Sequence, residues 1–133
     1  MDNLNHIAVF VSALCSLIIG AVWYSPILFY KIWKKENNLT EQELKKANPI
    51  KQYSICFLLA LLMSYNMAFF LADSKSDWVW GLTAGFLTGF GWAAAIFAII
   101  ALFELKTLKY IAVNTGYIII FFSISGLIIG AWK

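Results

Sequence analysis

The sequence predicts an all-α integral membrane protein, in which residues 1–133 form a single transmembrane domain of four helices. Hydrophobic residues make up 62% of the 133 positions and charged residues only 13%, against about 45–50% and 25% in soluble domains. Four apolar stretches, at about 7–30, 52–72, 78–103 and 110–132, each reach the roughly 20 residues that cross a bilayer. A water-soluble globule is excluded because so few polar groups could not cover its surface.

The first span, about 7–30, carries a predicted break near its end. Pro26 cannot donate to the Val22 carbonyl and clashes with it, so the dipeptide Ser25-Pro26 interrupts the helix. Residues 27–35 then either continue as a kinked helix or turn along the membrane interface. We favour the interface, because residues 1–25 already hold a span.

The connection 31–51 is the one long polar segment. Thr40 and Glu43 have the spacing of a capping box, which predicts a short surface helix over 41–47, ending before Pro49. A solvated loop is the alternative. The remaining connections, 73–77 and 104–109, are so short that the spans they join must be antiparallel neighbours.

The lysines predict the orientation. Eight of the ten basic residues lie in the first and third connections, and basic loops are normally cytoplasmic. We therefore expect a bacterial inner-membrane protein with residues 31–51 in the cytoplasm and both termini outside. A nucleic-acid partner is not expected, because no aromatic platform accompanies the basic residues. The eight lysines are Lys31, Lys34, Lys35, Lys45, Lys46, Lys51, Lys106 and Lys109.

Small residues recur every four positions in the first and third spans. Adding 69 to the numbers of Ser12, Ser16, Gly20 and Trp23 gives Gly81, Gly85, Gly89 and Trp92. This pattern predicts two parallel two-helix hairpin repeats. In that arrangement the first and third spans should be neighbours, with Gly20 and Gly89 at similar depth.

Small residues four apart let two helix backbones approach closely. We expect helix packing along Ser12, Ser16 and Gly20, along Gly81, Gly85 and Gly89, and at Gly126 with Gly130. Packing within one bundle is one interpretation. A homodimer seam along Gly81, Gly85 and Gly89 is the other.

No chemistry-bearing constellation stands out. The middle of each span lacks Asp, Glu, Lys and His, the side chains that mark proton and ion paths in membranes. Two cysteines without a nearby histidine do not form a metal site. We therefore expect neither a catalytic site, nor a metal, nor a cofactor.

A layer of polar and aromatic residues in the inner leaflet is the candidate ligand site. An indole N–H in hydrocarbon needs an acceptor, and the Asn114 amide oxygen could serve. The layer is either a hydrogen-bonded clasp within the bundle or the lining of a pocket for a small amphiphile. Its members are Trp23, Tyr24, Trp92, Asn114, Thr115 and Tyr117.

The same region carries a family resemblance. The run Trp23-Tyr24-Ser25-Pro26, followed by Phe29 and Trp33, resembles the W-Y-S-P-x-x-F-x-x-x-W motif of domain of unknown function family 1761, which comprises small bacterial four-span membrane proteins. Further matches are Gly89-Phe90, Gly116-Tyr117 and the ending Gly126-Leu127-Ile128-Ile129-Gly130-Ala131-Trp132. The resemblance implies the fold and the membrane location, and no particular activity.

These observations favour a non-enzymatic protein that binds or passes a small apolar or amphiphilic molecule. Membrane lipid is the expected partner, and a homo-oligomer, with a dimer favoured, is the expected assembly. The alternative is a structural subunit of a larger membrane complex that packs through its glycine face, the helix face with Gly81, Gly85 and Gly89.

Overall fold

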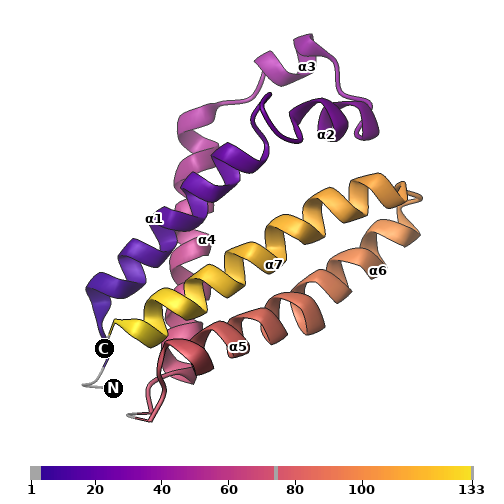
Figure 1. Cartoon of the computed structure of the whole chain (residues 1–133). Coiled ribbons are helices and arrows are strands. Elements are labelled where there is room, and N and C mark those ends of the chain that lie inside the picture. The colour runs from indigo at the N-terminus through magenta and orange to yellow at the C-terminus, as the bar shows by residue number, and fades with distance from the viewer. Residues whose placement is uncertain (1–3, 74, 133) are drawn as a thin grey trace.

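The computed structural model describes residues 4–73 and 75–132 and is helical, with no strand among them. Four helical segments are long and apolar enough to cross a membrane (Figure 1). They are α1 (His6–Trp23), α4 (Pro49–Phe70), the continuous run of α5 (Trp78–Thr88), η1 (Gly89–Ala94) and α6 (Ala95–Phe103), and α7 (Leu108–Ala131). The predicted fold class is confirmed, and the chain is a multi-pass membrane protein.

Side-chain caps set where most of these helices begin. Asn5, Asn48, Asp77 and Thr107 each accept a hydrogen bond from the amide three residues on, which satisfies one of the free N–H groups of the first turn. Thr40 caps α3 (Glu41–Lys45) in the same way, accepting from the Glu43 amide at 3.1 Å. The predicted surface helix is therefore present, although it ends at residue 45 rather than 47.

The first span ends earlier than the expected residue 30. Helix α1 stops at Trp23, and a separate helix α2 (Tyr30–Glu36) follows after a turn. The Ser25 hydroxyl donates to the Val22 carbonyl at 2.7 Å, so it replaces the bond that Pro26 cannot make. Figure 1 shows α2 turned away from the direction of α1.

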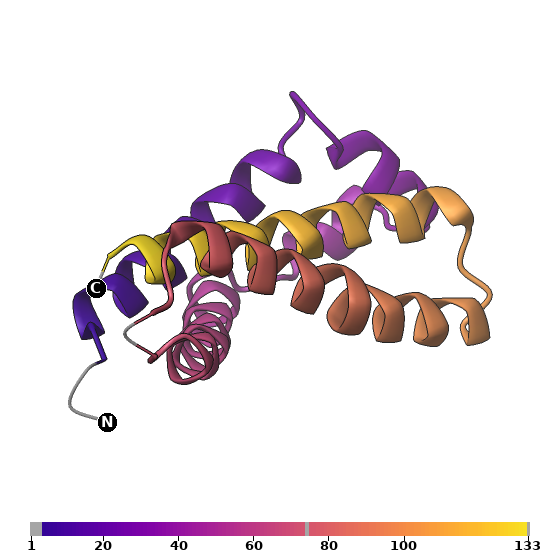
Figure 2. The ribbon, with the colours of Figure 1, turned by 60° about the horizontal axis from the view of Figure 1, so that its bottom comes forward.

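Helix α7 is the centre of the bundle and contacts every other spanning segment. It lies between α1 and the α5–α6 run in both views (Figures 1 and 2). The expectation that the first and third spans are neighbours is therefore wrong. Gly20 and Gly89 do meet the same turn of α7, at Tyr117 and Ile119 respectively, but from different sides. The partners of small residues depend on tertiary arrangement, which a spacing of four does not specify.

The glycines of α5 and η1 let that run approach α7 at backbone distance. A methyl group added at Gly81 would lie 2.1 Å from the Gly126 carbonyl oxygen, and one added at Gly85 would lie 2.1 Å from that of Phe122. At Gly130 the nearest atom would be the Asp77 carbonyl oxygen, at 2.5 Å. This glycine face is covered by α7 of the same chain, so it is excluded as a seam between two copies of the folded protein.

Ser12 of α1 packs against α4 instead. Ser12 and Ser16 are buried, and the Ser12 hydroxyl lies 3.2 Å from that of Ser64. Beside them Val9, Met67, Ala84 and Ile129 form one buried cluster with members from all four spans. The spans therefore converge near the chain termini, and Figure 1 shows α4 and α6 far apart at the opposite end.

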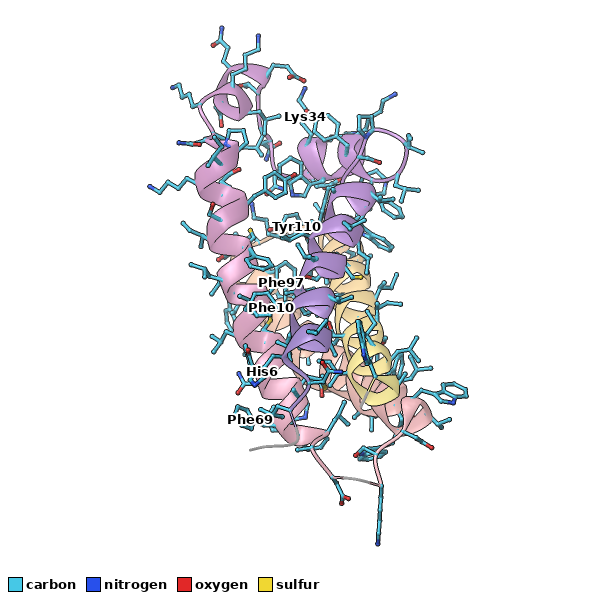
Figure 3. All side chains as sticks on the ribbon, turned by 90° about the vertical axis from the view of Figure 1, so that its left-hand side faces the viewer. His6, Phe10, Lys34, Phe69, Phe97 and Tyr110 are labelled. Atoms are coloured by element: carbon cyan, nitrogen blue, oxygen red, sulfur yellow. The ribbon has the colours of Figure 1, made fainter. Side chains whose placement is uncertain are left out.

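The first and third connections lie at that opposite end. The Thr107 hydroxyl, at the start of α7, donates to the Glu36 carboxylate at 2.5 Å. Figure 3 shows Lys34 at this end and His6 near the other. The connections that carry the eight lysines are thus joined at one end of the bundle.

Candidate functional site

The turn after α1 places the aromatic side chains of the candidate site. The Trp23 carbonyl accepts from the Phe29 amide at 3.1 Å, and the Ser25 carbonyl accepts from the Tyr30 amide at 3.2 Å. The rings of Trp23 and Phe29 then lie 4.6 Å apart. The Trp-Tyr-Ser-Pro motif therefore closes a compact turn in which the Phe29 ring packs on the Trp23 ring.

Trp23 clasps α7 through its ring nitrogen. Its Nε1–H donates to the Val113 carbonyl at 2.8 Å, so the predicted acceptor, the Asn114 amide, is wrong. The ring packs on Gly116, where an added methyl group would lie 2.7 Å from the indole. Because Gly116 has no side chain, the Trp23 indole can occupy the space beside its backbone.

Tyr117 makes the reciprocal contact from α7 to α1. Its hydroxyl donates to the Ser16 carbonyl at 3.1 Å, and its ring covers Gly20, where an added methyl group would lie 3.1 Å from the hydroxyl oxygen. Each of the two helices thus sends one aromatic side chain over a glycine of the other. Glycine at positions 20 and 116 leaves room for the rings of Tyr117 and Trp23, respectively.

Asn114 holds Tyr24 in place. The Tyr24 hydroxyl donates to Asn114 Oδ1 at 2.5 Å, and Asn114 Nδ2 donates to the Tyr110 carbonyl at 2.9 Å. Thr115 takes no part in this pair, because its hydroxyl donates to the Ile111 carbonyl of its own helix at 2.7 Å. Of the six predicted site residues, Trp23, Tyr24, Asn114 and Tyr117 are thus brought together.

Trp92 lies elsewhere, and its assignment to this layer is wrong. It is 78% exposed on η1. A π-helical turn takes more residues than an α-helical one, so after Gly81, Gly85 and Gly89 the next buried position is Ala94. The longer turn leaves the Trp92 indole outside the contact with α7.

Beside the Tyr24–Asn114 pair lies a groove of about 630 Å³. It runs between α1, α4 and α7, at the end where the spans diverge, and Trp33 of α2 borders it. The Trp33 ring stands 6.2 Å from the Tyr24 ring at 65°. The lining residues are Leu17, Gly20, Ala21, Tyr24, Trp33, Gln52, Tyr53, Ile55, Cys56, Asn114 and Tyr117.

The sequence did not predict that α4 forms one wall of this groove or that Trp33 borders it. Gln52 and Cys56 are four residues apart and therefore share a helix face, and Tyr53 follows Gln52. That polar face at the start of an otherwise apolar span is a signal that could have been used. Trp33 is the last residue of the family motif and lies in the segment 27–35 that is predicted to turn along the interface, but it is absent from the predicted site.

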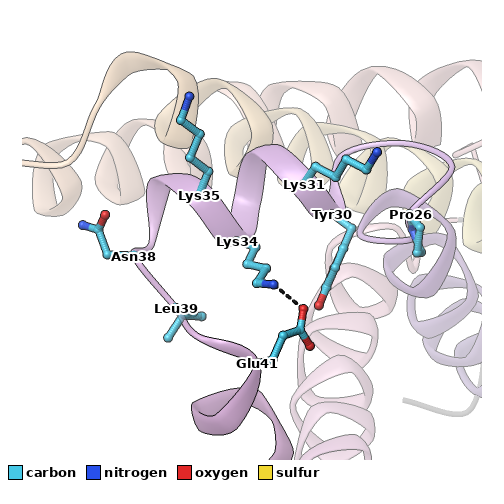
Figure 4. A pocket seen from close by; sticks show the side chains of 8 residues that line it. All are labelled: Pro26, Tyr30, Lys31, Lys34, Lys35, Asn38, Leu39 and Glu41. Atoms are coloured by element: carbon cyan, nitrogen blue, oxygen red, sulfur yellow. Dashed lines mark hydrogen bonds and ion pairs between the residues drawn. The ribbon is translucent and has the colours of Figure 1, made fainter.

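A second hollow, of about 440 Å³, lies between α2 and α3. Lys31, Lys34 and Lys35 line it together with Glu41, and Figure 4 shows Lys34 paired with the Glu41 carboxylate. The hydrogen bond to Lys34 lowers the pKa of the Glu41 carboxyl, and the same bond raises the pKa of Lys34. This hollow is charged, whereas the groove is lined by neutral side chains.

Over residues 4–73 and 75–132, no three His, Cys, Asp or Glu side chains come together closely enough to hold a metal ion. Cys15 and Cys56 are both free thiols.

A protein-family model described as "Protein of unknown function (DUF1761)" matches residues 7–130. The chain belongs to this family. No curated protein and no solved structure matches it. The residues that match the DUF1761 model include the turn after α1, the glycines at which α5 contacts α7, and all the groove residues.

Proposed function

We propose that this DUF1761 protein binds a small apolar or amphiphilic, lipid-like molecule in the groove between α1, α4 and α7, and that it does so without catalysing a reaction. We further propose that it works in the bacterial inner membrane with its termini outside. The groove then opens in the cytoplasmic half of the membrane. The lysine distribution of the connections supports this orientation.

The groove itself is the observation that supports binding. Its volume of about 630 Å³ falls within the roughly 300–1,000 Å³ of small-molecule sites. Leu17, Ala21 and Ile55 supply apolar wall, and Trp33, Gln52 and Asn114 supply polar groups. Apolar walls with a few polar groups suit a molecule that has a hydrocarbon body and a polar head.

Binding is favoured over passage because the rest of the bundle is closed. The cluster of Val9, Met67, Leu71, Ala84 and Ile129 is buried where the four spans converge. A molecule in the groove would meet this cluster before it reached the far side of the membrane. The expected subunit role through the glycine face has no such support, since α7 covers that face.

The test is native mass spectrometry of protein purified from bacterial membranes in a mild detergent. Wild-type protein should retain one amphiphile per chain. Ala21 lines the groove and is exposed, so the Ala21→Trp variant fills the site and should lose the adduct. Ala95 is exposed on α6, away from the groove, and the Ala95→Trp variant should keep it.

Two results would contradict the proposal. Wild-type protein could carry no adduct under conditions that preserve lipid on other membrane proteins. Alternatively, both tryptophan variants could carry the same adduct as wild type, which would place the bound molecule outside the groove.

A further inference from the structure

We propose that the groove selects an amphiphile whose polar head is uncharged, such as a long-chain alcohol or an acylglycerol. This inference rests on the proposed binding function and names its ligand class. It follows from the hydrogen-bonding groups left free in the groove and from the distribution of charge around α2.

The groove offers both donors and acceptors to a ligand. The hydroxyl protons of Tyr24 and Tyr117 are already donated to Asn114 Oδ1 and to the Ser16 carbonyl, and one of the two Asn114 amide protons is donated to the Tyr110 carbonyl. The hydroxyl oxygens of Tyr24 and Tyr117 still have lone pairs that can accept a hydrogen bond. These positions therefore suit a head group that donates a hydrogen bond.

The opposite wall supplies free donors. Within the part of the chain that the structure describes, the Trp33 ring nitrogen, the Gln52 amide and the Tyr53 hydroxyl line or border the groove and make no hydrogen bond to another residue. An indole N–H donates only, whereas an amide and a phenol do both. A hydroxyl or ester head satisfies such a mixed set, because it presents acceptor oxygens and, in an alcohol or partial acylglycerol, an O–H donor.

No charge faces this head group. The eleven residues along the groove, all within the described part of the chain, include no Asp, Glu, Lys or His. Helix α1 ends beside the groove and α4 begins there, so a negative and a positive helix end offset each other. A charged head would lose its hydration without gaining an opposite charge, which is strongly unfavourable.

The charges near this end gather on a different hollow. Lys31, Lys34, Lys35 and Glu41 border the space between α2 and α3; Lys34 points toward Glu41, whereas Lys31 and Lys35 extend away from it (Figure 4). Trp33 of the same short helix borders the groove instead. Helix α2 thus presents Trp33 to the groove, whereas Tyr30 and Lys34 lie on the side of the other hollow.

The experiment uses three probes that share one C18 chain and differ only in the head: oleyl alcohol, oleyl sulfate and oleyl trimethylammonium. The last two keep their charge at any working pH. Purified wild-type protein in a neutral detergent is titrated with each probe at equal mole fraction, and occupancy is read by native mass spectrometry. The Ala21→Trp and Ala95→Trp variants run in parallel as groove-filled and matched control proteins.

We expect oleyl alcohol to bind wild type and Ala95→Trp at least about tenfold more tightly than either charged probe, and to lose this binding in Ala21→Trp. If a charged probe binds as tightly as the alcohol, and Ala21→Trp removes it, the uncharged-head inference is overturned while the binding function stands. If none of the three probes responds to Ala21→Trp, both the inference and the proposed function fail.

Discussion

Substitution of Gly85 by alanine is a stringent test of the fold, because one methyl group must enter a contact between two helix backbones. The new methyl carbon would lie 2.1 Å from the Phe122 carbonyl oxygen and 2.9 Å from its carbon. Both atoms belong to the main chain of α7, so no rotamer change can relieve the overlap. To reach an ordinary contact of 3.4 Å, α5 must move away from α7 by about 1.3 Å.

The magnitude follows from that displacement. A gap of about 0.5–1 Å already forfeits a quarter to a half of the dispersion energy of each atom pair, and overpacking typically costs about 1–3 kcal/mol. Alanine also favours the helix over glycine by up to about 1 kcal/mol, which partly conceals the loss. A matched glycine-to-alanine control removes this second effect.

Gly91 provides that control. It lies in η1, and a methyl group added there would meet no atom within 4 Å. We expect the free energy of unfolding of Gly85→Ala to be about 1–3 kcal/mol lower than that of Gly91→Ala. Reversible unfolding in mixed micelles with increasing dodecyl sulfate, followed by circular dichroism, measures both values.

Equal unfolding free energies for the two variants would refute the packing argument. They would mean that α5 and α7 do not meet at backbone distance around Gly85. A Gly85→Ala protein that fails to reach the membrane would leave Gly89→Ala, whose added methyl group would lie 3.1 Å from the Ile119 Cα of α7, for comparison with Gly91→Ala, with the same expected order.

Three further predictions concern other parts of the chain. Gly116→Ala should displace the indole that packs on it and lower the unfolding free energy by about 1 kcal/mol; unchanged stability and unchanged tryptophan fluorescence would contradict this. In a cysteine-free background, a membrane-impermeant thiol reagent should label a cysteine at Asn3 in intact cells and spare one at Gln42, and the reverse result would invert the proposed orientation. The Lys34→Ala variant should raise the pKa of the Glu41 carboxyl toward its usual value of 4.5, as followed by NMR. Because the pKa of Glu41 is lowered in the folded protein, the Lys34–Glu41 pair stabilises the fold at pH values above the pKa of the unfolded chain, and this stabilisation is lost as the pH falls through the pKa of the folded protein. An unchanged titration midpoint of Glu41 in the variant would mean that the pair does not persist in solution.

Local signals predict much of this fold. Hydropathy and length place the four spans, Ser25-Pro26 marks the end of α1, and Thr40 with Glu43 marks α3. Each depends on interactions within a few residues, such as a cap or a lost backbone hydrogen bond. Such features can therefore be read along the chain without knowing what packs where.

Tertiary partners could not be predicted in the same way. The spacing of Gly81, Gly85 and Gly89 indicates a close contact, but it does not say that α7 makes it. One additional residue in the turn of η1 rotates Trp92 away from the buried side, and the regular spacing of the small residues conceals that turn.

The groove could be predicted only in part from the sequence, because it depends on how the helices diverge. Tyr24, Asn114 and Tyr117 were identified by their depth, but the α4 wall with Gln52 and Tyr53 was not. That wall exists because the spans converge near Val9 and diverge toward α2. Divergence of helices is a property of the whole bundle, so single-span patterns carry no trace of it.

The most direct test of the account is an experimental structure of the protein in a lipid nanodisc. The account predicts elongated density in the groove, with its apolar part along Leu17 and Ala21 and its head beside Trp33 and Gln52. A groove closed by α4 resting on Tyr117, or density there no different from that of lipid around the rest of the bundle, would contradict it.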